Sequence, residues 1–243
     1  MIFFNPSTYV VDLLDGVIDI HNHLLPYLDD GAQDLSESNA IIEKMRECNI
    51  SRAIATPHMM EDFYDLDRDK IAASYRSLRE SVDDDKKHFL QNYAAEYMID
   101  HRFLEMSCHR DLLLVCDRHI LVEFSYFRMP DFVTQVAFNL SNLDLTPILA
   151  HPERYSYISS MDSFEDLKKL KFKYQLNLLA LSGHYGSKSL QNSLKLLENG
   201  RYDFIGTDAH KPSHLEVLKK TKIKRKFKQY FENLILKHKE VIG

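Results

Sequence analysis

The chain has 243 residues, of which 44% are apolar and 28% are charged, a composition typical of a compact globular fold and not of a disordered or collagen-like protein. Its formal net charge of −5 is unevenly distributed, because residues 211–243 hold ten Lys or Arg against three Asp or Glu, a balance of +7 that leaves −12 for residues 1–210. An acidic body disfavours a nucleic-acid partner, and the lack of any apolar run of about 18 residues excludes a membrane span.

The predicted elements alternate between strands and helices along the chain. Residues 1–16 are expected to be an N-terminal extension; they hold no Lys or Arg, so the basic start of a secretory signal is missing. Seven apolar, β-branched-rich runs predict strands at Val17–His21, Arg52–Thr56, Leu90–Glu96, His119–Glu123, Thr146–Ala150, Gln175–Leu181 and Asp203–Thr207. Such alternation predicts parallel strands with right-handed crossovers, in an open sheet or a barrel of about seven or eight units.

Helical patterns occupy the segments between these strands. Asp34 is the predicted N-cap of one helix, with Glu37 three residues later, and a leucine stripe on another ends at Gly200. Residues 213–240 predict a basic amphipathic helix, with Ile223 and Phe227 on its apolar stripe. We expect this helix to pack on the barrel of a single domain spanning residues 1–243, with contact to an anionic membrane surface or an acidic partner as the alternative.

Acidic residues and histidines follow six of the seven predicted strands, at the point where each strand ends. Parallel barrels place their active sites at these carboxyl ends, whereas an open sheet gathers ligands beside only a few strands. The pattern therefore favours a closed or distorted barrel. The donors it brings together are His21, His23, Asp30, His58, Glu96, Glu123, His151, Asp208 and His210.

Nine nitrogen and oxygen donors exceed the needs of one metal ion. The histidines at positions 21 and 23 share one face of a strand, and imidazole with carboxylate but no thiolate suits two or three ions such as Mn²⁺, Fe²⁺ or Zn²⁺. The alternative is a set of buried polar residues satisfied by ordinary hydrogen bonds, which would carry large desolvation and repulsion costs.

Arg154 follows the predicted ligand His151 by three residues. Its guanidinium suits two oxygens of a phosphoryl group, and the alternative is a structural salt bridge with Glu153 or another acid. The three cysteines form no CxxC pair and none has an arginine six residues later, so a cysteine phosphatase is excluded and a reducing cytosol is expected. Neither a GxSxG nor a GxxxxGK[ST] motif is present, which leaves water activated by metal ions as the nucleophile.

These motifs together resemble the PHP (polymerase and histidinol phosphatase) superfamily. The resemblance rests on Asp19-Ile-His-Asn-His23, Leu25-Pro26, Asp29-Asp30-Gly31-Ala32, Thr56-Pro57-His58, Ala95-Glu96, Val122-Glu123-Phe124, His151-Pro-Glu-Arg-Tyr155 and Asp208-Ala-His210. The second, third and seventh of these motifs are similar to the bacterial capsule-type tyrosine-protein phosphatases, the CpsB/CapC family. The resemblance implies a distorted (β/α)7 barrel, a three-ion site that usually holds manganese, and cytoplasmic hydrolysis of phosphotyrosine on the tail of a bacterial tyrosine autokinase that controls capsule and exopolysaccharide export.

The same resemblance implies a role for each predicted site residue. The first ion would be held by His21, His23, Glu96 and Asp208, the second by Glu123 and His151 with Glu96 bridging, and the third by Asp30, His58 and His210. Arg154 would bind the phosphoryl group while water attacks phosphorus in line. The phenol leaving group has a pKa of about 10, so it needs little acid assistance and no general acid is assigned.

Two segments depart from the family pattern and leave substrate preference open. Lys211-Pro212-Ser213-His214 follows Asp208-Ala-His210, and His184 and Tyr185 are additions to the loop after the sixth predicted strand. Two other functions stay open as well. One is a small-molecule phosphomonoesterase such as histidinol-phosphate phosphatase, and the other is a PHP module that binds metal without catalysis.

Overall fold

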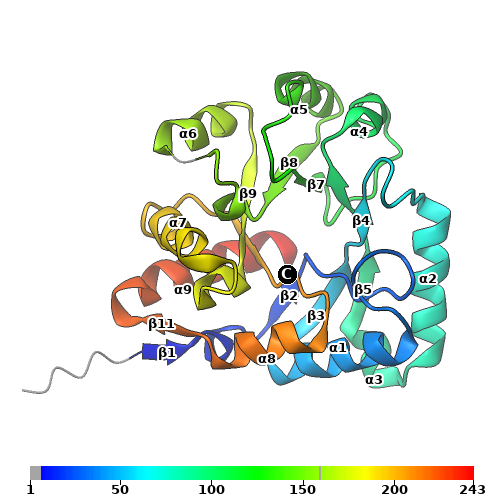
Figure 1. The fold of residues 1–243 in the computed structure, drawn as a ribbon. Helices are drawn as coiled ribbons and strands as arrows, with labels where there is room; N and C mark the ends of the chain where they lie inside the picture. The colour runs from blue at the N-terminus through cyan, green and yellow to red at the C-terminus, as the bar shows by residue number, and fades with distance from the viewer. Residues whose placement is uncertain (1–6, 159) are drawn as a thin grey trace, which may run out of the picture.

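The computed structural model describes residues 7–158 and 160–243, so part of the expected N-terminal extension, residues 1–6, lies outside the described residues. Strands and helices alternate along the chain, and the helices lie around the outside of the strands (Figure 1). The strands are β1 (Ser7–Tyr9), β2 (Val17–Asp19), β3 (Ile50–Ala55), β4 (His58–Met59), β5 (Leu90–Tyr93), β6 (Glu96–Met98), β7 (His119–Glu123), β8 (Thr146–Ala150), β9 (Lys173–Asn177), β10 (Phe204–Gly206) and β11 (Lys222–Lys224).

The helices follow the predicted alternation. The α-helices are α1 (Leu35–Glu47), α2 (Arg68–Ser81), α3 (Asp84–Phe89), α4 (His101–Met106), α5 (Val133–Asn142), α6 (Met161–Lys169), α7 (Gly186–Glu198), α8 (Pro212–Lys220) and α9 (Arg225–Ile242). The short 3₁₀ helices of the described residues are η1 (Val10–Leu13), η2 (Pro152–Arg154) and η3 (Leu178–Ser182). The side chain of Asp34 accepts from the Glu37 N–H, which confirms the predicted cap of α1. Gly200, with φ of +62°, follows the end of α7 as predicted.

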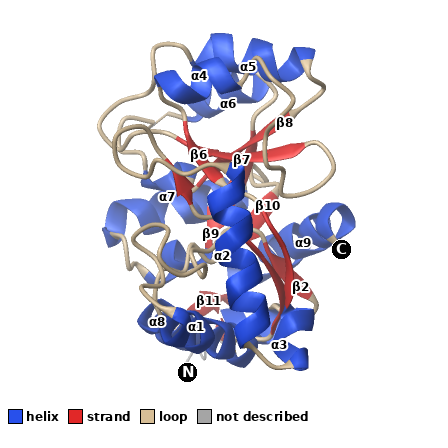
Figure 2. Ribbon diagram, turned by 90° about the vertical axis from the view of Figure 1, so that its right-hand side faces the viewer, coloured by secondary structure: helices blue, strands red, loops and turns tan. Residues whose placement is uncertain are grey.

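Most strands form one curled parallel sheet in the order β10-β9-β8-β7-β6-β4, and β2-β3-β5 form a second parallel sheet. Hydrogen bonds join the two sheets just beyond the carboxyl ends of β2 and β10. Asn22 and Ala209 form a parallel bridge, and the Asp208 N–H donates to the His21 carbonyl over 2.7 Å. The fold is therefore mixed α/β with a curled parallel sheet, and helices cover its outer faces (Figure 2).

Several strands end earlier than the apolar runs that predicted them, and for two of these runs the structure shows a local cause. The run Leu90–Glu96 divides into β5, which pairs with β3, and β6, which pairs with β4 and β7, because the chain passes from one sheet to the other at the small, buried residues Ala94 and Ala95. The run Gln175–Leu181 stops being a strand at Asn177. Its side chain accepts from the Leu179 N–H and so begins η3.

The single helix predicted over residues 213–240 is wrong. The structure has α8 and α9 separated by β11, which pairs antiparallel with β1. Ile223 is buried between the exposed Lys222 and Lys224, an alternation typical of a strand edge, and the Val10 N–H donates to the Thr221 carbonyl. Residues 7–14, expected to be an extension, are thus packed against this segment, and Val10 is fully buried.

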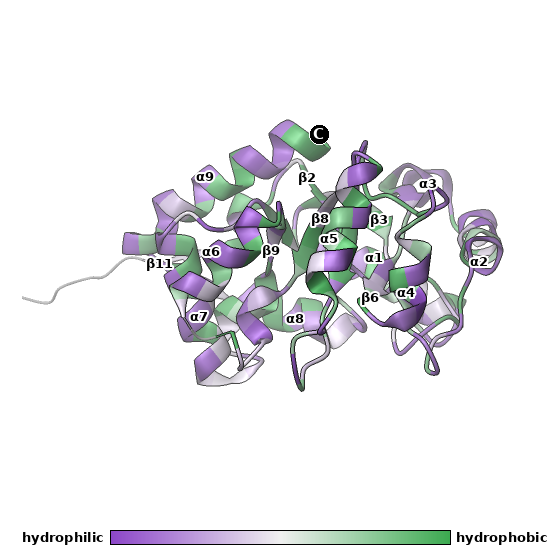
Figure 3. Cartoon of the chain, turned by 90° about the horizontal axis from the view of Figure 1, so that it is seen from above, coloured by the Kyte–Doolittle hydropathy of each residue, from purple (hydrophilic) through white to green (hydrophobic). Residues whose placement is uncertain are grey.

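The last helix keeps the amphipathic character that the sequence indicated. Hydrophobic and hydrophilic residues alternate along α9 (Figure 3), and Phe227, Phe231 and Leu234 are buried while Arg225 and Lys226 are exposed. Within residues 7–158 and 160–243, no helix combines the length and the apolarity that crossing a membrane would require.

Candidate metal centre

The nine predicted donors converge at the carboxyl ends of the parallel strands. They come from the segments after β2, β3, β5, β8 and β10 and from the last residue of β7, and His58 and Glu96 are also the first residues of β4 and β6. Eight of them make up three overlapping groups in which one ligand atom from each residue lies within 4.8 Å of the others: His21, His23, Glu96 and Asp208; His23, Asp30, His58 and His210; and His58, Glu96 and Glu123. The ninth, His151, lies against the third group.

The first group is the deepest and has the four members that the family resemblance implied. The His21 Nε2 atom lies 3.0 Å from Glu96 Oε2 and 3.4 Å from Asp208 Oδ1. The His23 Nε2 atom lies 3.4 Å and 3.5 Å from the same two oxygens. Two imidazole nitrogens and two carboxylate oxygens therefore face one point, an arrangement that suits a divalent transition metal.

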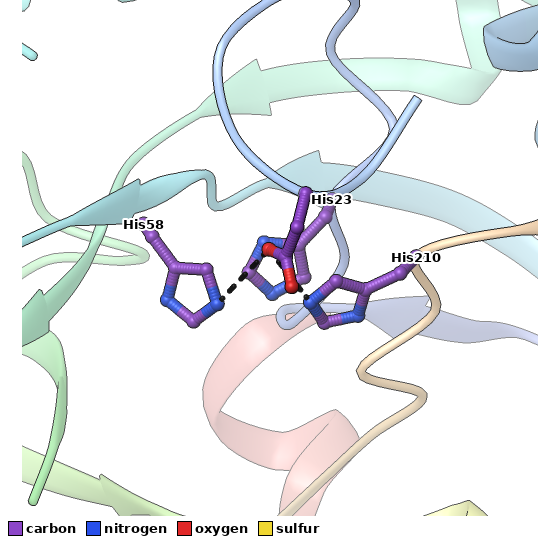
Figure 4. A group of neighbouring side chains, drawn as sticks. His23, His58 and His210 are labelled. Atoms are coloured by element: carbon purple, nitrogen blue, oxygen red, sulfur yellow. Dashed lines mark ion pairs between the residues drawn. The ribbon is translucent and has the colours of Figure 1, made fainter. Parts of the chain in front are cut away.

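The second group lies nearer the surface. The Asp30 Oδ1 atom lies 3.6 Å from His58 Nε2 and 3.4 Å from His210 Nε2. Figure 4 shows the His23, His58 and His210 rings gathered around this carboxylate, and the centroids of the His23 and His210 rings are 3.8 Å apart. His23 was not expected in this group, because the reach of its ring cannot be read from the sequence.

The third group differs from the expected set in one residue. His58 takes the place that the resemblance implied for His151, with its Nδ1 atom 2.9 Å from Glu123 Oε1 and 3.1 Å from Glu96 Oε2. The His151 Nε2 atom lies 3.1 Å from Glu96 Oε1 and 3.9 Å from Glu123 Oε2. Glu96 thus touches both sides of the cluster, which fits the bridging position that the resemblance implied.

The chemistry of the buried atoms fits a cation. Among the described residues, His21 Nε2, His23 Nε2, His58 Nδ1, Glu96 Oε2 and Glu123 Oε1 are buried without a hydrogen-bond partner, although they face one another at close range. Burying polar atoms in this state is costly unless another group compensates them. Mixed imidazole and carboxylate ligands without thiolate suit Mn²⁺, Fe²⁺ or Zn²⁺.

Neighbouring imidazole rings oppose the effect of burial on the Glu96 carboxylate. Burial would raise the pKa of Glu96, but the neighbouring His21 and His58 hold it well below its usual range. Burial likewise would lower the pKa of His21, yet the carboxylates of Glu96 and Asp208 raise it. These opposing effects show that the carboxylates favour positive charge at this point, which a bound metal ion would supply.

Residues outside the nine fix the imidazole rings. The His21 Nδ1–H donates to Gln175 Oε1 over 2.9 Å, and the His23 Nδ1–H donates to Asp29 Oδ2 over 2.8 Å. The same Asp29 oxygen accepts from the His58 backbone N–H over 2.9 Å. Such partners orient metal-binding histidines. Sequence reasoning missed both residues as ring partners. The position of Asp29 next to the predicted ligand Asp30 could have indicated its role. Nothing in the sequence indicated that Gln175, on a distant strand, contacts His21.

The local backbone aims two of the donors. His151 and Asp208 have left-handed φ values of +36° and +53°, which turn their side chains inward as the strands end. A Cβ atom at Gly206 would lie 2.7 Å from the His21 Cβ, so only glycine lets β10 approach the first histidine this closely.

Arg154 lies beside the cluster on η2. Its Nη1 atom donates to Asp208 Oδ2 over 2.8 Å, so its partner is a predicted metal ligand and not Glu153. Glu153 is buried and accepts from the Asn177 N–H and the Tyr202 hydroxyl. A cavity of about 240 Å³ opens in front of the guanidinium, and its lining is Asp30, Arg154, Tyr185, Asp208, His210, Lys211 and His214. Both segments that depart from the family pattern therefore contribute residues to the lining of the cavity.

The cysteines take no part in this site. Burial raises the pKa of Cys48 to about 12 and that of Cys116 to about 11, and Cys108 is exposed on the surface. A thiol whose pKa is raised in this way is a poor nucleophile.

Known proteins share both the sequence pattern and the fold. The family described as "Capsular polysaccharide synthesis, CpsB/CapC" matches residues 17–241. The CapC protein of Staphylococcus aureus is 27% identical over 90% of this chain and 87% of its own length. The tyrosine-protein phosphatase YwqE of Bacillus subtilis is 30% identical over 80% of this chain and 77% of its own length.

A solved structure is similar over most of the chain. It belongs to the pair YwqE from Bacillus subtilis and CpsB from Streptococcus pneumoniae, described as metal-dependent tyrosine phosphatases. Its TM-score is 0.72 at 26% sequence identity, over 84% of this chain and 87% of the solved one.

Proposed function

Because this chain belongs to the CpsB/CapC family of capsular polysaccharide synthesis, we propose that it is a metal-dependent phosphatase that hydrolyses phosphotyrosine in proteins. The observation that carries the proposal is the placement of the Arg154 guanidinium 2.8 Å from Asp208, a carboxylate that also belongs to the buried donor cluster. A phosphoryl group in the adjacent cavity could then contact the cluster and the guanidinium together.

The proposed metal ligands are the nine donors of the cluster, and manganese is the proposed ion because its preferences suit carboxylate and imidazole. Divalent ions held there would supply a nucleophile by lowering the pKa of water and would neutralise charge on the phosphoryl oxygens. Gln175 and Asp29 keep the His21 and His23 rings in place through their Nδ1 atoms. Their Nε2 atoms are thereby turned toward the carboxylates.

Arg154 is the proposed phosphate-binding residue. Its planar guanidinium can donate to two phosphoryl oxygens, and its fixed position lets it stabilise charge that develops as the group transfers. The tyrosine leaving group is a phenoxide of low basicity, with a pKa of about 10, so departure needs little help from an acid.

The finer features of the proposal extend the family assignment. The strands would form a distorted (β/α)7 barrel, which the bridge between Asn22 and Ala209 supports. Residues 1–243 would act as one catalytic domain. The substrate would be the phosphorylated tail of a bacterial tyrosine kinase that controls capsule synthesis, and the exposed basic residues of β11 and α9 would be available for peripheral contact with an anionic membrane.

The experiment compares two substrates under two metal conditions. Purified protein would be assayed on a phosphotyrosine peptide and on histidinol phosphate, each with added Mn²⁺ and after chelation. The proposal expects turnover of the peptide that depends on Mn²⁺ and exceeds turnover of histidinol phosphate. Preference for histidinol phosphate would identify a small-molecule phosphomonoesterase. Metal binding without turnover of either substrate would identify a non-catalytic module.

A further inference from the structure

The Arg154 guanidinium lies between two tyrosine rings. Its Cζ atom is 4.0 Å from the centroid of the Tyr185 ring and 4.7 Å from that of the Tyr126 ring. Its Nη1 atom donates to Asp208. Within the part of the chain that the structure describes, Nε and Nη2 have no hydrogen-bond partner. The guanidinium is therefore held in place while two of its nitrogens keep free donors.

The rings come from two separate loops. Tyr126 follows β7, and its ring also stacks on the His151 ring at a centroid distance of 5.9 Å. Tyr185 immediately precedes α7, and its hydroxyl lies 3.1 Å from Asn177 Nδ2 and 3.4 Å from Asp208 Oδ2. Each ring therefore touches both the arginine and a member of the donor cluster or its partner.

The two oxygens of Asp208 divide between the two halves of the site. Oδ1 faces His21 and His23, while Oδ2 accepts from Arg154 and, over 2.7 Å, from Asn177 Nδ2. The Tyr185 hydroxyl is directed at the second oxygen. A shift of this ring would consequently disturb the guanidinium and the carboxylate that joins it to the cluster.

Free arginine side chains sample many rotamers, and each must be restricted before the guanidinium can bind a phosphoryl group in one geometry. Ring faces attract a cation without consuming its N–H donors. A donor that is already in position stabilises a developing charge better than one that must be ordered during the reaction. Two ring faces and one carboxylate can supply this order.

We propose that Tyr185 and Tyr126 are positioning residues that fix the Arg154 guanidinium for phosphoryl binding. The inference rests on the proposed phosphatase function and on the phosphate-binding role of Arg154. Tyr185, one of the residues that depart from the family pattern, would thus affect the reaction by holding Arg154 in place and would not touch the reacting atoms. Tyr185 carries the larger share, because its ring is nearer and its hydroxyl reaches Asn177 and Asp208.

The test is a double-mutant cycle of Tyr185→Leu and Arg154→Ala on a phosphotyrosine peptide with Mn²⁺. Tyr185→Leu removes the ring face and is expected to lower kcat/KM about tenfold, the scale of a partly desolvated cation–π contact. Tyr185→Phe keeps the face and should restore most of this loss. In the Arg154→Ala background, Tyr185→Leu should cause no further loss, because the group it positions is gone.

Tyr126→Leu should also lower kcat/KM, by a smaller factor than Tyr185→Leu. Tyr230→Leu is the matched control for Tyr126→Leu. Tyr230 lies on α9 with 41% of its surface exposed, against 43% for Tyr126, and its removal should leave kcat/KM unchanged. Elemental analysis should find equal metal content in all variants. Calorimetry with inorganic phosphate should find weaker binding to the Tyr185→Leu protein by about tenfold, which a purely structural role would not produce.

Each contrary outcome has a distinct meaning. If Arg154→Ala lost most of its kcat/KM while Tyr185→Leu kept the wild-type value, this inference would be overturned and the proposed function would stand. Equal losses from Tyr185→Leu in both backgrounds would also overturn it, because the ring would then act independently of Arg154. Full activity in Arg154→Ala would overturn both the phosphate-binding role and the inference.

Discussion

At the amino ends of the strands, both oxygens of the buried Asp203 carboxylate accept hydrogen bonds. At the carboxyl ends, by contrast, one oxygen of the buried Glu96 carboxylate has no hydrogen-bond partner among the described residues. Asp203 pairs with Lys168, with Lys173 over 3.4 Å and with Lys237 over 2.7 Å, and it accepts from a backbone N–H of β9. The Glu96 Oε2 atom faces His21 Nε2 and His58 Nδ1, which likewise have no hydrogen-bond partner among the described residues.

The two buried carboxylates differ in what compensates their charge. Burial would raise the pKa of each, and neighbouring positive groups lower both instead. The Asp203 carboxylate is saturated by the protein itself and joins α6, β9 and α9. The Glu96 carboxylate has capacity left over, which suits a cation. Stability should therefore depend on Asp203 and chemistry on Glu96, and the following changes test that separation.

Replacing Glu96 with Gln should have the largest effect, because the change keeps the shape of the side chain but removes the charge from the centre of the cluster. We expect bound Mn²⁺ to fall and kcat to decrease by more than about a hundredfold, since even indirect supports of a metal site cost up to that factor. Elemental analysis and kcat on a phosphotyrosine peptide measure the two effects. Glu232→Gln on α9 is the control, and full metal occupancy in Glu96→Gln would contradict the ligand assignment.

Replacing Arg154 with Lys keeps the charge beside the cluster but removes the planar pair of donors. We expect normal metal content and a loss in kcat/KM of roughly a hundredfold, or about 3 kcal/mol, as for removal of one preorganised donor. Arg201→Lys, which alters an ion pair with Glu165 far from the cluster, should leave kcat/KM unchanged. If Arg154→Lys lost only thermal stability, the residue would be structural.

Replacing Asp203 with Ala should affect the opposite end of the molecule. Three ammonium groups lose their shared partner, and breaking a buried pair of this kind costs about 3 kcal/mol. Urea denaturation would measure the decrease in the free energy of unfolding, and kcat of the folded protein should be unchanged. Asp166→Ala removes an exposed pair with Lys169 and should cost less than about 1 kcal/mol. A loss of bound metal in Asp203→Ala would contradict the expectation that Asp203 contributes to stability and not to the chemistry of the metal site.

A histidine buried away from the cluster gives stability its own dependence on pH. His238 on α9 accepts from the Ile205 N–H and donates to the Ile18 carbonyl, and burial lowers its pKa to about 4. Below about pH 6.5 the unfolded chain takes up a proton that the folded protein refuses, so the free energy of unfolding should decrease between about pH 6.5 and 4, by about 3 kcal/mol in total, and be flat above.

The measurement is denaturant unfolding from pH 4 to 8 of the wild-type and His238→Gln proteins. Comparison with the variant removes the contributions of the other titrating groups, which both proteins share. The difference between the two stabilities should shrink as the pH falls toward 4. A constant difference over the whole range would show that His238 is not held in its neutral form by burial.

The alternation of strands and helices and the identity of the clustered donors could both be predicted from the amino-acid sequence. Apolar runs of β-branched residues indicated strands, and parallel strands bring their carboxyl ends to one side whatever the details of packing. The donors at those ends therefore had to meet. Local signals such as the Asp34 cap and Gly200 were equally readable, because they depend on residues only a few positions apart.

The grouping of those donors and the residues that support them became visible in the folded structure alone. The place of His58 beside Glu123, the contact of Gln175 with His21 and the two rings on Arg154 all join residues from different strands or loops. The pairing of β11 with β1 likewise replaced a helix that its own sequence pattern favoured. Distances of this kind depend on loop conformation and on the register between distant segments, and no local pattern of residues records either.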